Sequence, residues 1–155
     1  MKQLLFVLTM LCGCLWVSTC DKEEELEVMD NVSIFKTNTA DFNTEKFTLN
    51  CENGKLRLKH LHAGLFSLGA SFKGEVKLKG NTLFVNEFAT GGENVNGVDS
   101  YSFDFTISQL VEGKKYTLII RQWSILPDDP QESLRHSFTF SKDYSETIIR
   151  ENNVD

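Results

Sequence analysis

The sequence is poor in cysteine, proline and histidine, with four, two and three of these residues among 155. Three of the four cysteines lie within the first twenty residues, which leaves too few for a fold held together by disulfides. The chain also lacks a basic run, and its 22 acidic residues outnumber 16 basic ones, for a formal charge of −6. This balance argues against nucleic acid or anionic lipid as a partner.

Recognisable catalytic motifs are missing as well. The sequence has no Gly-x-Ser-x-Gly elbow, no glycine-rich phosphate loop and no paired-cysteine metal spacing. No two carboxylates stand in a pattern from which glycosidic cleavage could be inferred, and Asp104 alternates outward between Phe103 and Phe105. We therefore predict that the protein is not an enzyme and that it needs no cofactor.

The first residues have the pattern of a secretion signal. A short positive start is followed by an apolar run, residues 4–17, which is shorter than the roughly 18 to 20 residues of a membrane-spanning helix. Small residues then precede Cys20, and this arrangement resembles the bacterial lipobox, in which the signal is cut before a cysteine that carries the lipid. We predict a lipoprotein signal peptide over residues 1–19 and lipid attachment, including palmitate, at Cys20.

Two alternatives remain for this segment. Cys14, preceded by Leu11 and Gly13, is a competing lipidation site, and a plain secretory signal would leave Cys20 free. Polarity switches only at Asp21, which favours Cys20 over Cys14.

An acidic stretch follows the predicted lipid site. Residues 21–25 read DKEEE, and dense like charge keeps a segment solvated. We predict an acidic tether over residues 20–31. Acidic residues after a lipidated cysteine also resemble the surface-export signal of Bacteroidetes lipoproteins, which implies an outer-membrane, surface-exposed protein.

Apolar and polar residues alternate with a period of two in the rest of the chain, the pattern of half-buried strands. Asn53-Gly54 and Gly80-Asn81 are strong signals for tight turns. The strands predicted in this way cover residues 32–36, 46–51, 55–61, 72–78, 83–89, 101–108, 116–122, 134–140 and 144–149. We predict one all-β domain over residues 32–155, with no helix.

The segment Leu110–Tyr116 favours one all-β architecture over another. It resembles the E–F corner of immunoglobulin-like domains, in which a Tyr hydroxyl bonds back to the corner backbone. We therefore predict an immunoglobulin-like β-sandwich of about 7–9 antiparallel strands. An up-and-down β-barrel is the alternative, because its strands alternate in the same way.

The corner assigns residues 56–61 to strand B, 72–78 to strand C and 134–140 to strand G. Because successive strands alternate in direction, the three long loops then gather at one end, where sandwich folds carry their binding loops. The loops cover residues 62–71, 90–99 and 124–133. The candidate binding residues at this end are Phe66, Trp123, Asp128 and Asp129.

The three histidines offer a further alternative. His60 and His62 are two residues apart and would share one face of a strand, and His136 could supply a third metal ligand. The face of His60 also carries Leu56 and Leu58, however, which indicates a core histidine. We predict no metal site and keep a metal-binding protein or metal-dependent enzyme as the alternative.

Several short motifs lie between residues 54 and 120. They are the strand Leu56-Arg57-Leu58-Lys59-His60, then Phe66, Phe103-Asp104 and the corner Leu110–Tyr116. This pattern resembles that of small Bacteroidetes lipoproteins of uncharacterised function. The cysteine pairs of that pattern are replaced here by Ser67-Leu68 and Tyr101-Ser102.

These observations predict a non-catalytic, lipid-anchored protein of the bacterial cell envelope. It would meet the membrane through Cys20 and use the loop end as a binding or accessory module for a glycan, a peptide or an envelope protein. A purely structural envelope component is a further alternative.

Overall fold

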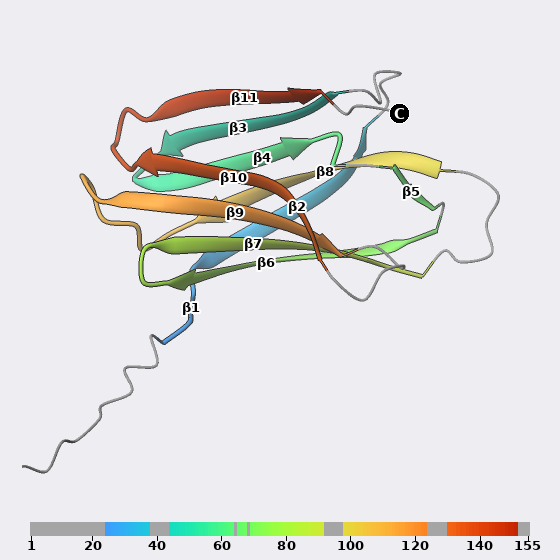
Figure 1. Cartoon of the computed structure of the whole chain (residues 1–155), viewed down its shortest axis with the longest axis horizontal. Coiled ribbons are helices and arrows are strands. Elements are labelled where there is room, and N and C mark those ends of the chain that lie inside the picture. The colour runs from blue at the N-terminus through green and yellow to red at the C-terminus, as the bar shows by residue number, and fades with distance from the viewer. Residues whose placement is uncertain are drawn as a thin grey trace, which may run out of the picture.

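A computed structural model describes residues 24–37, 44–63, 65–67, 69–91, 98–123 and 130–151 of the chain. These residues form strands, turns and no helix, in two sheets that stack as a sandwich and do not close into a barrel (Figure 1). The predicted all-β sandwich is confirmed, and the barrel alternative is wrong.

Each sheet combines strands that are distant in the sequence. The five-stranded sheet has the order β1 (Leu26–Glu27), β6 (Ser71–Lys79), β7 (Thr82–Thr90), β9 (Lys115–Trp123) and β10 (Gln131–Thr139). The six-stranded sheet has the order β11 (Ser145–Glu151), β3 (Thr44–Glu52), β4 (Lys55–Leu61), β8 (Val98–Ile107) and β2 (Met29–Thr37), and the short β5 (Leu65–Ser67) pairs with the start of β8.

Both predicted tight hairpins are present. Glu52 pairs with Lys55 across Asn53 and Gly54, whose φ angles of 53° and 75° suit these two residue types. Lys79 likewise pairs with Thr82 across Gly80-Asn81. These local signals therefore fix two antiparallel pairs, β3–β4 and β6–β7.

The order of strands in the five-stranded sheet differs from the one that the corner suggested. In immunoglobulin-like sheets strand C lies beside strand F, but here β7 separates β6, assigned to C, from β9 and pairs with β9 in parallel. The outer face of β6 carries charged residues such as Lys73 and Lys77, whereas β7 is apolar on much of both faces. Charged residues suit a strand near the sheet edge, and an apolar strand is better covered in the interior.

The N-terminal segment links the two sheets along one side. β1 pairs with β6 of one sheet and β2 with β8 of the other. Val28, between them, is 1% exposed; its N–H donates to the Val76 carbonyl (3.2 Å) and its carbonyl accepts from the Ser108 N–H (2.9 Å). The sandwich thus begins at Leu26 rather than at residue 32, and the later part of the predicted tether belongs to it, because Val28 is a core residue.

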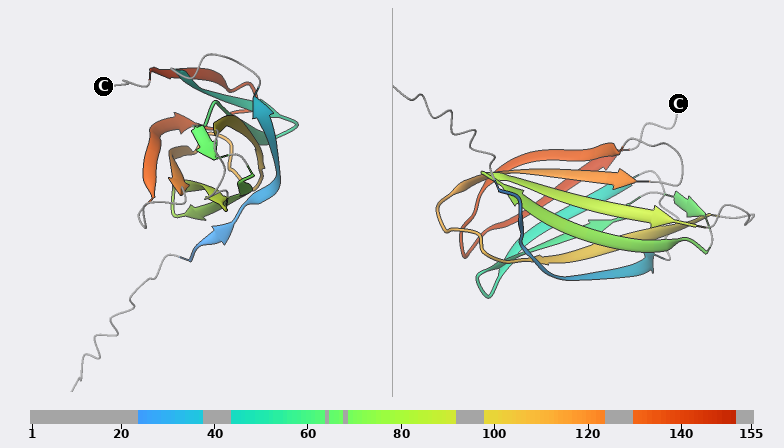
Figure 2. Two further views of the ribbon diagram at one scale, coloured as in Figure 1. Left: turned by 90° about the vertical axis from the view of Figure 1, so that its right-hand side faces the viewer. Right: turned by 90° about the horizontal axis from the view of Figure 1, so that it is seen from below.

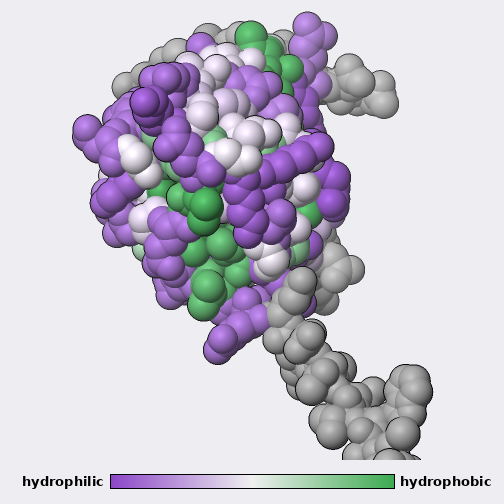
Figure 3. All heavy atoms as spheres, turned by 90° about the vertical axis from the view of Figure 1, so that its left-hand side faces the viewer, coloured by the Kyte–Doolittle hydropathy of each residue, from purple (hydrophilic) through white to green (hydrophobic). Residues whose placement is uncertain are grey.

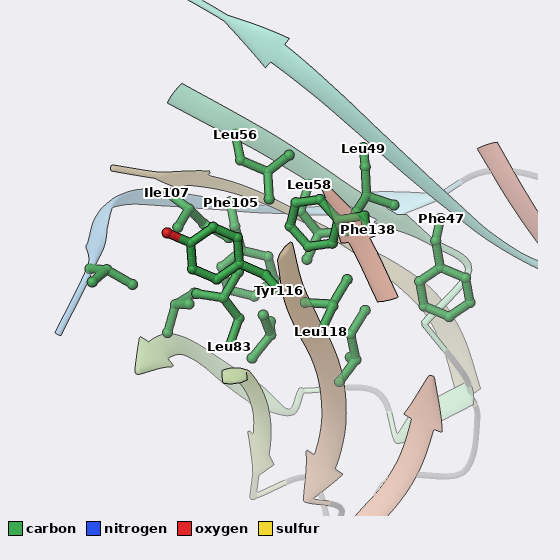
Figure 4. Close-up of a cluster of buried hydrophobic side chains, with 14 of the residues drawn as sticks. Phe47, Leu49, Leu56, Leu58, Leu83, Phe105, Ile107, Tyr116, Leu118 and Phe138 are labelled. Carbon is green, nitrogen blue, oxygen red and sulfur yellow. The ribbon is translucent and has the colours of Figure 1, made fainter. Parts of the chain in front are cut away.

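The core fills the space between the sheets, and Figure 4 shows side chains from both sheets meeting there. Phe47, Leu49, Phe105 and Leu118 are among the residues with no exposed surface. The packing is tight where β6 crosses β8, since a Cβ at Gly74 would lie 2.5 Å from Cε1 of Phe105. Only glycine fits this position without displacing the ring.

The predicted tyrosine corner is confirmed. Tyr116 is 1% exposed, and its hydroxyl accepts a hydrogen bond from the Val111 N–H at 2.9 Å. Gly113 has a φ of 78°, and its N–H donates to the Phe140 carbonyl at 2.8 Å. The corner therefore closes the core and ties β9 to the end of β10.

The sandwich has two different ends. The turn end carries the two hairpin turns, the corner and the turn between β10 and β11, and hydrophobic residues reach its surface among hydrophilic ones (Figures 1 and 3). The opposite end is called the loop end, because the strand ends that flank residues 62–70, 91–97 and 124–130 all lie there (Figure 2). The predicted gathering of these strand ends is confirmed.

Candidate functional site

Only some of the candidate residues can be placed. Cys20, Asp128 and Asp129 lie outside the described residues. Phe66 belongs to β5, and its backbone pairs with that of Asp99 at the loop end. Trp123 is the last residue of β9 and also lies at the loop end.

The three histidines have different partners. His60 lies in the core with no exposed surface, and its Nδ1 is 3.0 Å from each carboxylate oxygen of Glu87. His62 follows β4 with a φ of 58°, and its Nδ1 is 3.4 Å from Ser100 Oγ. This turn of the backbone takes His62 out of the strand, so the predicted shared face of the two residues is lost.

His136 lies at the side of the sandwich, where its Nε2 is 2.9 Å from Glu146 Oε2. Among the described residues, no three His, Cys, Asp or Glu side chains are placed to hold a metal ion. The arrangement of His60, His62 and His136 as one metal site is therefore wrong, because each imidazole is committed elsewhere.

A buried polar network surrounds His60 near the loop end. The Gln122 side-chain amide donates to Glu87 Oε2 at 3.1 Å and to the Ala63 carbonyl, and Gln122 Oε1 accepts from Ser133 Oγ at 2.8 Å. The network connects β7, β9 and β10 with the end of β4, and so crosses between the two sheets. His60 and Glu87 have at most 1% exposed surface, so this network acts inside the fold rather than on a ligand.

Glu45 lies close to the same network. It is 5% exposed, and Arg150 Nε is 3.7 Å from its Oε2. Burial raises the pKa of the Glu45 carboxyl, while the charges of His60 and Arg150 oppose this shift. Glu45 Oε2 and His60 Nε2 are buried without a hydrogen-bond partner among the described residues. This region therefore contains two unsatisfied polar atoms, which are rare in the interior of a protein.

A different surface lies on the outer face of the five-stranded sheet. Phe88 of β7 and Trp123 of β9 are paired in register, and their rings stack with centroids 4.7 Å apart and planes 25° apart. Two positions earlier on each strand the side chains are polar, because Asn86 is paired with Arg121. The Arg121 guanidinium lies 4.5 Å from the centroid of the Phe84 ring.

These two stacked pairs border a groove with a volume of about 290 Å³, which Glu75 and Lys77 of β6 also line. Asn86 lies between the pairs and is 7% exposed. Its Nδ2 donates to Glu75 Oε1 at 2.9 Å, and its Oδ1 has no partner among the described residues. The groove therefore combines aromatic borders with a nearly buried amide, whose unpartnered Oδ1 lies below the accessible surface.

Phe88 also lines a second hollow, nearer the loop end. This hollow has a volume of about 380 Å³ and is bordered by Ser71, Phe72 and Thr90. Lys73 extends along it, with its Nζ 6.0 Å from the Phe88 centroid. Because Phe88 borders both hollows, they form one extended surface over β6, β7 and β9, which is called the aromatic groove below.

Trp123 was predicted as a candidate, but Phe84, Asn86, Phe88 and Arg121 were not. A sequence signal for two of them exists. Successive side chains of a strand point to opposite faces, and Leu83 and Val85 point into the core. Phe84 and Phe88 must therefore lie on the outer face of the same strand. Nothing in the sequence shows that β9 lies beside them.

Fold and groove together define an all-β sandwich protein with an open aromatic surface on one sheet. Comparison with known proteins adds no family to this description, since no family model, curated protein or solved structure matches the chain. The part of the chain that the structure describes contains no helix of the length and hydrophobicity needed to cross a membrane.

Proposed function

We propose that the protein is a non-catalytic binding module that holds a saccharide chain in the aromatic groove. The observation that carries the proposal is the stacked pair of Phe88 and Trp123, which borders a groove that polar and charged side chains also line. Aromatic rings pack well against the C–H faces of pyranoses, and sugar hydroxyls are hydrogen-bond donors. The rings of Phe88 and Trp123 supply such an aromatic face. The polar side chains of Glu75, Lys77 and Arg121 along the groove can exchange hydrogen bonds with hydroxyls.

The dimensions of the groove favour an extended ligand. Phe84 and Phe88 are four residues apart on β7, which places them about 13 Å apart along the strand at roughly 3.3 Å per residue. The second hollow continues beyond Phe88 toward the loop end. A surface of this kind, open along its length, suits several units of a chain better than one enclosed small molecule.

The test is binding of the full-length chain, purified in mild detergent, to an array of oligosaccharides, followed by titration of the best ligand. Trp123→Ala removes one of the stacked rings and should weaken binding by at least about tenfold, as expected for an aromatic anchor. The matched control is Phe35→Ala, which removes an aromatic ring that is 43% exposed on the six-stranded sheet. It should bind like the wild type.

Two results contradict the proposal. One is that no saccharide on the array binds, which would favour a purely structural role. The other is that Trp123→Ala and Phe35→Ala lose the same small amount of affinity. The unfolding midpoint of each variant, measured beside the binding curves, shows whether a loss reflects the groove or the fold.

We also propose that Cys20 anchors this module in the bacterial envelope through a lipid. The support is the apolar run of residues 4–17 and the small residues that lead to Cys20, followed by an acidic stretch. Cys20→Ser should abolish incorporation of labelled palmitate and leave the signal uncleaved, whereas Cys14→Ser should change neither. Palmitate labelling that survives in Cys20→Ser but not in Cys14→Ser would move the anchor to Cys14.

A further inference from the structure

The aromatic groove carries more positive than negative charge in an otherwise acidic protein. Its part next to Asn86 is lined by Lys77, Lys79 and Arg121, against Glu25 and Glu75. Among the described residues, the adjoining hollow adds Lys73 and no acidic side chain. The chain as a whole has a formal charge of −6, so this surface runs against the average charge of the molecule.

Two acidic residues near Arg121, Glu75 and Glu132, have other partners. Glu75 accepts a hydrogen bond from Asn86, and its carboxylate lies 3.6 Å from Lys77 Nζ and 4.0 Å from Lys73 Nζ. Glu132 is the register neighbour of Arg121 on β10, but its carboxylate is bonded to Arg135 at 2.9 and 2.7 Å. Neither carboxylate therefore satisfies Arg121 by hydrogen bonding.

The guanidinium of Arg121 has hydrogen-bond donors that could bind an anion. Among the described residues it makes no hydrogen bond or ion pair within 4 Å; its guanidinium lies over the Phe84 ring, and its charge also attracts the nearby Glu132 carboxylate. A guanidinium that lies over a ring keeps N–H groups available for hydrogen bonds, and its planar fork matches an anionic oxygen pair. Lys79 likewise has no partner among the described residues.

We infer that the aromatic groove selects a saccharide chain that carries anionic groups, with Arg121 as the main contact to the anion and Lys79 as a second. This inference rests on the proposed function, because the stacked rings of Phe88 and Trp123 supply the recognition of the sugar itself. An acidic peptide would meet the same cations. It would make less use of the aromatic faces of Phe88 and Trp123.

The experiment compares ligands that differ in charge alone. The full-length chain in mild detergent is titrated with hexagalacturonate and with its fully methyl-esterified form, which keeps the same rings without the negative charges. The acid should bind about tenfold more tightly than the ester at low salt, and the preference should shrink in 0.5 M salt, as charge-assisted contacts are screened. A sulfated hexasaccharide in a third arm distinguishes sulfate from carboxylate.

Two variants assign the preference to residues. Arg121→Gln should lose most of the preference for the acid, measured as the ratio of the affinities for acid and ester in the same variant. Lys79→Gln should lose a smaller part. The control is Lys46→Gln on the six-stranded sheet, where an exposed lysine is neutralised far from the groove; it should retain the preference.

The outcomes separate this inference from the proposed function. Tighter binding of either anionic probe than of the ester, lost in Arg121→Gln, supports the inference. Equal binding of acid and ester that Trp123→Ala abolishes overturns the anionic preference but leaves saccharide binding intact. Binding of hexaglutamate that matches the acid and survives Trp123→Ala overturns both, and so does the absence of binding to these hexasaccharides and to the whole array.

Discussion

The two ends of the sandwich are held together in different ways. At the turn end the hydrogen bond from the Val111 N–H to the Tyr116 hydroxyl joins residues five apart in the sequence. At the loop end, His60 and Glu87 are 27 residues apart, Gln122 and Glu87 are 35 apart, and Gln122 and Ala63 are 59 apart. The turn end therefore combines a local closing bond with a longer-range bond from Gly113 to Phe140, whereas the network at the loop end consists of groups that only the folded chain brings together.

The two ends also differ in charge. The closing bond at the turn end is made by two neutral groups. The loop end buries Glu45, His60 and Glu87, and two of their polar atoms have no partner among the described residues. A buried network of this kind stabilises the fold only while its members stay paired, so its loss should cost more than the loss of the corner bond.

The network also lies directly beneath the proposed binding surface. Glu87 and Gln122 precede Phe88 and Trp123 on β7 and β9, and both pairs are in register. Successive residues of a strand point to opposite faces, so the polar pair is buried below the stacked rings. The interior of the loop end therefore supports the two strands that carry the outer aromatic pair.

The largest effect on this comparison is expected from Glu87→Ala. It leaves His60 Nδ1 and part of the Gln122 amide without a buried acceptor, which should lower the free energy of unfolding by about 3 to 5 kcal/mol. Urea unfolding measures the change. Glu112→Ala, an exposed acidic residue in the corner, is the control and should stay within about 0.5 kcal/mol of the wild type.

If Glu87→Ala does not fold, Glu87→Gln gives the same comparison with a smaller change, because its amide keeps the shape and one acceptor. A loss no larger than that of Glu112→Ala would show that the network contributes little. The difference drawn between the two ends would then fail.

A smaller effect is expected from Tyr116→Phe at the turn end. The ring stays in the core while the Val111 N–H loses its partner, which should cost about 1 to 3 kcal/mol. Urea unfolding of Tyr144→Phe is the comparison, because this variant also removes a tyrosine hydroxyl but one that bonds to Glu146 outside the corner. An unfolding curve for Tyr116→Phe identical to the wild type would remove the corner as a source of stability.

The smallest effect should appear in the pH dependence of stability. Because burial raises the pKa of Glu45 above its ordinary value of 4.5, the folded state holds the proton more tightly than the unfolded state does. Ionisation of Glu45 therefore lowers the stability of the wild type as the pH rises from about 4 toward neutrality. Glu45→Gln has no carboxyl to ionise at this position. The stability of the variant relative to the wild type, measured as the difference in their free energies of unfolding, should therefore gain as the pH rises over this range.

Thermal unfolding at several pH values, wild type beside variant, measures that gain. Tyr116→Phe serves as the control, since its difference from the wild type should stay constant over the same range. A difference for Glu45→Gln that is constant, or that shrinks as the pH rises, would contradict a raised pKa for the buried carboxyl.

The fold was predictable where neighbouring residues decide it. Alternation indicated nearly all the strands, two Asn/Gly pairs indicated the hairpins, and the corner indicated a sandwich. We did not predict from the sequence that β7, rather than β6, lies next to β9. The lysines on the outer face of β6 and the aromatic residues on the outer face of β7 are a signal for this order. Sheet order depends on how both faces of a strand are covered, and a motif in another segment does not report this.

The candidate site was predictable only in part. The sequence singled out Trp123 and the loop end, and it indicated that His60 belongs to the core. It did not indicate that Glu87 reaches His60 or that Phe88 stacks on Trp123. The first contact joins β7 to β4 of the other sheet, and the second joins β7 to β9, which is separated from it in the sequence by a strand of the other sheet. Such pairings leave no mark in a local pattern.

The sequence by itself therefore determined the all-β class, the positions of most strands and the closed corner, since period-two alternation and turn chemistry act over a few residues. Only the tertiary structure decided the parallel pairing of β7 with β9, the buried network around His60 and the aromatic groove above it. These depend on which strands become neighbours in a sheet. That choice is made by burying the faces of all the strands together, and no single segment contains it.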